Sequence, residues 1–79
     1  MKSPLRLEPG ERPADDIIAA LREGRRVVLD VQVAGSAHEV VLRYDGETYH
    51  CDTPTSLHRH SEEAEMRACL DRMGYAAEN

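Results

Sequence analysis

The chain has 79 residues, a formal net charge of −5 at pH 7, and neither Phe nor Trp. A chain of this length folds as one domain, and its core must be built from Val, Leu, Ile, Met and Tyr. Because so small a core favours self-association, we expect a homodimer or another protein as the partner. The acidic balance argues against a protein that grips nucleic acid through its phosphates.

The sequence contains no apolar run of membrane-spanning length, and Met1–Pro4 lacks the apolar core of a signal peptide. We therefore expect a cytoplasmic protein that does not bind membranes. The two cysteines, Cys51 and Cys69, are too few for a disulfide framework. We expect both to be reduced, buried thiols.

The chain divides into a core region and two ends. Residues 1–12 include the alternation Leu5-Arg6-Leu7 between two prolines, which indicates an N-terminal tail or a short edge strand. Residues 13–75 should form a single α+β domain. Residues 76–79 should be a flexible C-terminal tail.

Two segments have the pattern of amphipathic helices. The first runs from Pro13 to about Glu23, where proline suits the first turn and Gly24 suits the end. The second runs from Ser61, expected as the N-cap, to Met73, and Gly74 ends it. The two apolar stripes comprise Ile17, Ile18 and Leu21, and Met66, Cys69, Leu70 and Met73.

The middle of the chain is typical of three antiparallel strands joined by two tight turns. Asp45-Gly46 between two β-rich runs indicates a two-residue type I′ turn, which would place Leu42 opposite Tyr49. Gly35-Ser36 fits a type II′ turn, which would place Leu29 opposite Leu42. The residues from Cys51 to His60 should then be a loop, with Leu57 turned toward the core.

These two turns agree on which side chains share a face of the sheet that spans Val27–Thr53. One face would carry Val27, Leu29, Val31, Val40, Leu42, Tyr44, Tyr49 and Cys51. The other, mostly polar face would carry Val28, Asp30, Gln32, Glu39, Val41, Arg43, Thr48, His50 and Asp52. The order α-β-β-β-α predicts a two-layer α+β fold, a three-stranded antiparallel meander with both helices on one face.

The polar sheet face is the first candidate for a functional surface. It carries Val28 and Val41 with Arg43, Thr48 and His50 beside them, and such a face can dock a second protein. The outer strands of a meander can also pair with another chain. We therefore expect a small non-catalytic interaction or regulatory module that self-associates through the open sheet face or an edge strand.

A metal-binding module is the alternative. A His-x-His pair such as His58 and His60, joined by His50, Asp52 or Cys51, could hold zinc. In a regular strand, however, Cys51 points inward while His50 and Asp52 point outward, and no recognised zinc spacing is present. We expect no obligatory cofactor.

A catalytic thiol is a further possibility that the pattern argues against. Cys51 and Cys69 both fall on predicted core faces, where burial raises the pKa of a thiol and makes it inert. A domain this small also has little room for a substrate pocket. We predict no catalytic residue and no enzymatic activity.

Nucleic-acid binding is the third function considered. The order α-β-β-β-α and the turn Gly35-Ser36-Ala37-His38 resemble the double-stranded-RNA-binding domain. That resemblance implies lysines at the start of the last helix, which meet phosphates. This chain instead has Ser61-Glu-Glu-Ala-Glu65, whose carboxylates repel phosphate. A degenerate nucleic-acid site would have to use Arg22, Arg25, Arg26 and His38.

Overall fold

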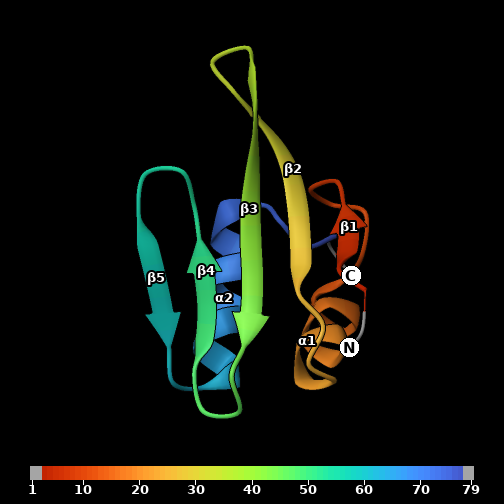
Figure 1. The fold of residues 1–79 in the computed structure, drawn as a ribbon, viewed down its shortest axis with the longest axis vertical. Helices are drawn as coiled ribbons and strands as arrows, with labels where there is room; N and C mark the ends of the chain where they lie inside the picture. Colours follow the sequence, from red (N-terminus) through yellow and green to blue (C-terminus); the bar gives the residue numbers. More distant parts are fainter. Residues whose placement is uncertain (1–2, 78–79) are drawn as a thin grey trace.

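The computed structural model describes residues 3–77 and has an α+β fold, as predicted from the sequence. Its sheet has five strands rather than three, in the order β1-β2-β3-β4-β5 (Figure 1). The elements are β1 (Leu5–Leu7), α1 (Ala14–Arg22), β2 (Val27–Val33), β3 (Ser36–Tyr44), β4 (Tyr49–Asp52), β5 (Leu57–His60) and α2 (Glu63–Met73).

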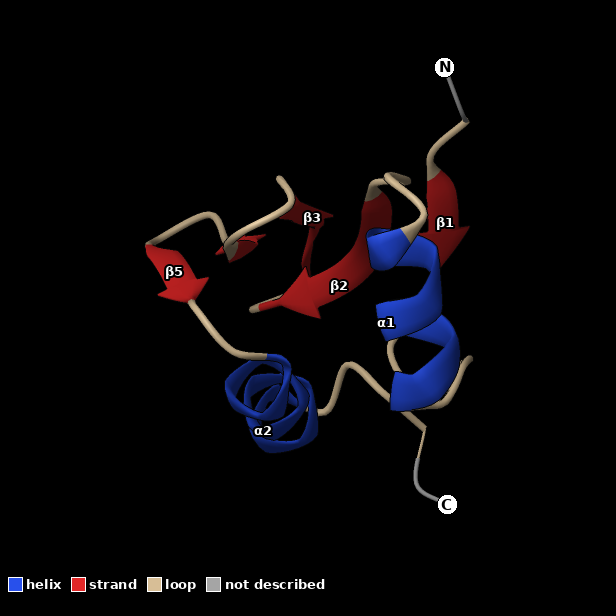
Figure 2. Cartoon of the chain, turned by 90° about the horizontal axis from the view of Figure 1, so that it is seen from below, coloured by secondary structure: helices blue, strands red, loops and turns tan. Residues whose placement is uncertain are grey.

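The molecule has two layers, with both helices on the same side of the sheet (Figure 2). The core lies between the layers, where the inward strand side chains meet the apolar stripes of the helices. Its fully buried members include Ile17, Leu21, Val27, Leu29, Val40, Leu42, Cys51, Met66, Cys69 and Leu70. We call the helix-covered side of the sheet the inner face and the opposite side the open face.

The turn between β2 and β3 differs from the predicted one. Its two central residues are Ala34 and Gly35, with φ of 53° and 81°, so it is Ala34 and not Ser36 that shares the turn with the glycine. Leu29 therefore pairs with Val40 instead of Leu42. Because this shift is two residues, every side chain keeps its predicted face.

The turn between β3 and β4 is longer than the predicted Asp45-Gly46 pair. Asp45 Oδ1 accepts hydrogen bonds from the amides of Glu47 and Thr48, at 2.9 and 2.8 Å. This side-chain capping stabilises a four-residue connection. The predicted pairing of Leu42 with Tyr49 is thus wrong, and Leu42 pairs with Cys51, again on the predicted face.

The two additional strands lie at the edges of the sheet. β1 pairs with β2 in parallel, with Arg6 beside Val28. β5 pairs with β4, with Arg59 beside His50, in the segment that had been expected to be a loop. Leu57, expected to enter the core, lies on the open face and is 66% exposed.

The helix ends follow the expected chemistry with two changes. Pro13, expected in the first turn, is instead the N-cap of α1. Glu62, not Ser61, is the N-cap of α2, and it forms a reciprocal capping box with Glu65. Gly74 closes α2 in the left-handed conformation.

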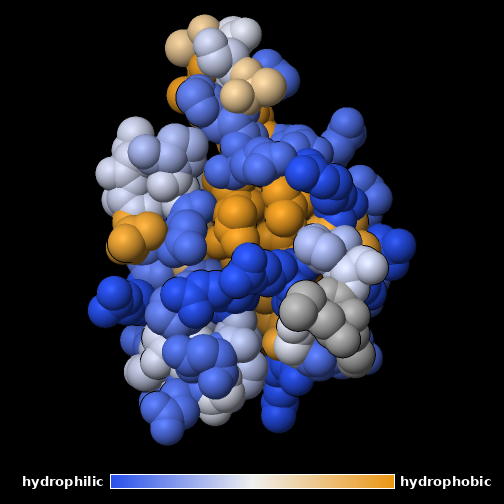
Figure 3. Space-filling model, in the orientation of Figure 1, coloured by the Kyte–Doolittle hydropathy of each residue, from blue (hydrophilic) through white to orange (hydrophobic). Residues whose placement is uncertain are grey.

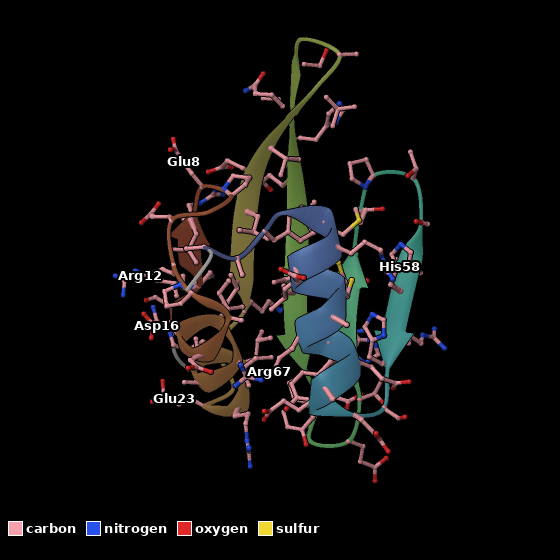
Figure 4. All side chains as sticks on the ribbon, turned by 180° about the vertical axis from the view of Figure 1, so that it is seen from behind. Glu8, Arg12, Asp16, Glu23, His58 and Arg67 are labelled. Carbon is pink, nitrogen blue, oxygen red and sulfur yellow. The ribbon has the colours of Figure 1, made fainter. Side chains whose placement is uncertain are left out.

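The chain ends and the helix interface complete the fold. Ala77 donates its amide to the Arg12 carbonyl at 2.8 Å, so the expected tail is anchored there, and residues 78–79 lie outside the described part. Arg67 of α2 bridges the helices by pairing with Asp15 of α1 at 2.6 Å and with Glu63 at 3.0 Å (Figure 4).

Candidate interaction surface

The open face has no helix of residues 3–77 against it, and it presents an apolar centre surrounded by hydrophilic side chains (Figure 3). Val28 and Val41, which are cross-strand partners on β2 and β3, lie at this centre. Val28 is 8% exposed and Val41 is half-buried. We call these two residues the valine pair.

A basic row crosses three strands on one side of the valine pair. It consists of Arg43, His50 and Arg59, which are register partners on β3, β4 and β5. Within residues 3–77, neither Arg43 nor Arg59 forms an ion pair. These two guanidinium groups are therefore available to an acidic partner.

His50 is the most buried polar residue of this row, at 9% exposed. Its Nε2 lies 3.0 Å from Asp45 Oδ2. This hydrogen bond, together with those from the Thr48 and Glu47 amides, holds the pKa of the Asp45 carboxyl well below its usual range. The pair fixes the His50 ring beside Arg43 on the open face.

An acidic pair lies on the other side of the valine pair. Asp30 and Glu39 are directly opposed on β2 and β3, where like charges repel. Arg6 of β1 bridges them, with Nη1 at 3.2 Å from Asp30 Oδ1 and Nη2 at 2.8 Å from Glu39 Oε2. Because Arg6 supplies one positive charge against two carboxylates, this side remains negative.

The sheet edges are less suited to a partner. β1 offers three residues and β5 offers four, and a short edge provides few unpaired backbone groups. The open face spans all five strands. The geometry therefore favours the face over the edges.

The inner face carries a groove at one end of the molecule. It has a volume of about 240 Å³ and lies between the tip of the β2–β3 hairpin, the β4–β5 turn and the end of α2. Val33 and Met73 in this groove are 52% and 42% exposed, so the prediction that Met73 packs in the core is wrong. Nothing about the groove indicates a particular ligand.

The residues proposed as zinc ligands are divided by the sheet. The strand register puts His58 and His60 on the inner face with Cys51, and it puts His50 and Asp52 on the open face. His58, labelled in Figure 4, forms a hydrogen bond through its Nε2 to Ser56 Oγ at 3.0 Å. Among residues 3–77 there is no group of three His, Cys, Asp or Glu side chains that could hold a metal ion.

The two cysteines lie together in the core, Cys51 on β4 and Cys69 on α2. Burial, with a smaller effect from the adjacent Cys69, raises the pKa of the Cys51 thiol to about 12. The Cys51 thiol therefore stays protonated at neutral pH and is not an activated nucleophile of the kind that covalent catalysis uses.

The four residues proposed for nucleic-acid binding do not form one patch. Arg25 and Arg26 precede β2, whereas His38 lies near the hairpin at the far end of that strand, roughly 20 Å away for a seven-residue strand. Arg22 pairs with Glu63 at 3.2 Å, and Arg25 donates to the Ser3 carbonyl.

Arg6, Arg59 and the role of the Asp30–Glu39 pair were missed by the sequence analysis. The signal existed, since Leu57-His58-Arg59-His60 alternates as a strand does. Pro54 obscures this signal, because proline cannot donate a hydrogen bond to a strand ladder and favours the end of a strand. In the structure Thr53 and Ser56 instead close a tight turn, with the Thr53 amide bonded to the Ser56 carbonyl at 2.9 Å.

The fold and surface together define a small α+β domain with one covered and one open sheet face. Residues 1–78 match the model of DUF8001, a family of unknown function, and the chain belongs to that family. Comparison with curated proteins and with solved structures found no match. No helix of the described residues is both long and apolar enough to cross a membrane.

Proposed function

We propose that this protein is a small non-catalytic interaction module that self-associates through its open sheet face. The observation that carries the proposal is the valine pair, an apolar centre on a face that no helix of residues 3–77 covers. The polar rim around an apolar centre is the usual anatomy of a protein interface.

The inner face supports the choice of a non-catalytic role. Its fully buried positions are filled by packed apolar side chains, and Cys51 and Cys69 are buried among them. The chemistry that remains on the surface is that of recognition: apolar contact, arginine and carboxylate.

Self-association also fits the size of the core. A chain of 79 residues without Phe or Trp buries little apolar surface on its own. Covering the valine pair with a second copy would remove Val41 from water and add to the free energy of unfolding.

Sedimentation velocity of the purified chain, at concentrations on the order of 100 μM, tests the proposal. We expect a dimer that Val41→Glu converts to monomer, because the new carboxylate would be buried at the contact. Val33→Glu is the matched control, since Val33 is exposed on the inner face and should leave the dimer intact. A wild-type chain that sediments only as monomer would overturn the proposal.

A further inference from the structure

Along β3, charges of opposite sign lie at equal distances on either side of Val41. On β3, Glu39 lies two residues before Val41 and Arg43 lies two residues after it. Alternation along a strand keeps all three side chains on the same face. The middle strand of the sheet therefore carries a negative, an apolar and a positive side chain in a line.

The neighbouring strand repeats part of this arrangement. On β2, Asp30 lies beside Glu39 and Val28 lies beside Val41. On β4, at the other side of β3, Asp52 lies beside Val41. The two carboxylates of Asp30 and Glu39 are therefore neighbours on one side of the valine pair, and Arg43 lies on the other.

We propose that the partner on this face is a second copy of the chain, related by a two-fold axis that crosses the strands through the valine pair. This inference rests on the proposed function and specifies its geometry. Rotation about such an axis reverses the strand direction of one copy. Val41 then faces Val41 of the second copy, and Arg43 of each copy faces Glu39 of the other.

An isologous contact therefore forms two complementary Arg43–Glu39 ion pairs around Val41, and it leaves Asp52, beside Val41 on β4, opposite Asp52 of the other copy. Packed sheets lie about 10 Å apart, which opposing Arg and Glu side chains can span. A two-fold axis along β3 would instead place Arg43 opposite Arg43 and Glu39 opposite Glu39, and like charges would repel.

The intrachain contacts leave these groups able to pair. Arg43 forms no ion pair within residues 3–77. Arg6 binds Oε2 of Glu39, and among the hydrogen bonds of the described chain none involves Oε1 of that carboxylate. Glu39 is also exposed at 53% of its side chain, so its second oxygen can accept from an incoming guanidinium.

Charge reversal tests the orientation. We expect Arg43→Glu and Glu39→Arg each to weaken the dimer on the order of 100-fold, because each puts two like-charge pairs into the contact. An equimolar mixture of the two variants should form a heterodimer, since one copy then carries two positive and the other two negative charges. The double variant Glu39→Arg with Arg43→Glu should regain the homodimer.

The controls separate this inference from the proposed function. Arg72→Glu changes an exposed arginine on α2, away from the sheet, and should leave the dimer unchanged. Glu39→Lys mixed with Arg43→Asp provides a second matched set should Glu39→Arg fold poorly. If Val41→Glu abolishes the wild-type dimer but neither charge reversal weakens it, the two-fold orientation is wrong and the proposed function stands. A wild-type monomer would overturn both proposals.

Discussion

The inner and open faces of the sheet are formed by the same strands, yet they carry different chemistry. The inner face has Leu29, Val40 and Leu42 with essentially no exposed surface. The open face sets Val28 and Val41 between charged rows. The comparison shows that one face supplies the free energy of folding, while the other retains charges that a core could not tolerate.

The largest expected effect comes from a cavity on the inner face. Leu42→Ala should lower the free energy of unfolding by about 2–5 kcal/mol, because Leu42 is fully buried in the core cluster. Val41→Ala, one residue away on the open face, should cost about 1 kcal/mol or less in the monomer. Urea denaturation of both variants measures the difference. Equal losses would show that the two faces do not differ in packing.

Thiol accessibility gives the next largest contrast. Cys51 and Cys69 should resist an aromatic disulfide reagent in the folded protein and react fully in denaturant, since both are buried and the pKa of Cys51 is raised to about 12. A cysteine placed on the open face by Gln32→Cys is the matched control and should react at once, because Gln32 is exposed on β2. Rapid labelling of the native thiols without denaturant would contradict the packed inner face.

Acid should weaken the turn that supports the open face. The pKa of Asp45 is lowered in the folded state, so its contribution to stability is present above the unfolded-state value of about 3.9 and is lost as pH falls below it. Asp45→Asn keeps an oxygen for the Glu47 and Thr48 amides but cannot titrate. We expect a smaller loss of stability for this variant between pH 5 and pH 3, measured by urea midpoints. If Asp45→Asn and the wild type lose the same stability over this pH range, the acid sensitivity belongs to other carboxylates.

The smallest effect is expected at the hairpin tip, where both faces are exposed. Ala34 has a φ of 53°, which costs an L-residue about 1 kcal/mol. Ala34→Asn creates the preferred type I′ pair with Gly35 and should raise the free energy of unfolding by about 0.5–1 kcal/mol. Ala37→Asn, on the following strand, is the control and should bring no gain in thermal stability.

The faces could be predicted from sequence because a strand alternates with a period of two. Both predicted turns were wrong, yet each error shifted the register by two residues, so Leu42 and Cys51 remained inward. The turns themselves depended on features that pattern does not reveal. Ala34 adopts a left-handed conformation unusual for alanine, and Asp45 caps a longer loop with its side chain.

The charge arrangement of the candidate surface could be predicted only in part. The strand alternation in the sequence predicts that Glu39, Val41 and Arg43 share one face, and the proposed two-fold arrangement rests on these three residues. It could not supply Arg6, because a three-residue strand forms only where a longer strand offers an edge to pair with. Each residue of β1 pairs with a residue of β2 that is 22 positions further along the chain. This pairing is therefore set by tertiary packing and not by local propensity.

The strand order has a consequence for how quickly the chain folds. Every strand pairs with the next one along the chain, so no connection has to pass over a strand already in place. Three of the four pairings are hairpins, and closing a short loop costs little entropy. We therefore expect the β2–β3–β4–β5 ribbon to assemble from its turns before β1 joins it. The parallel pairing of β1 with β2 closes the longer connection that contains α1, and it completes the open face by bringing Arg6 to Asp30 and Glu39.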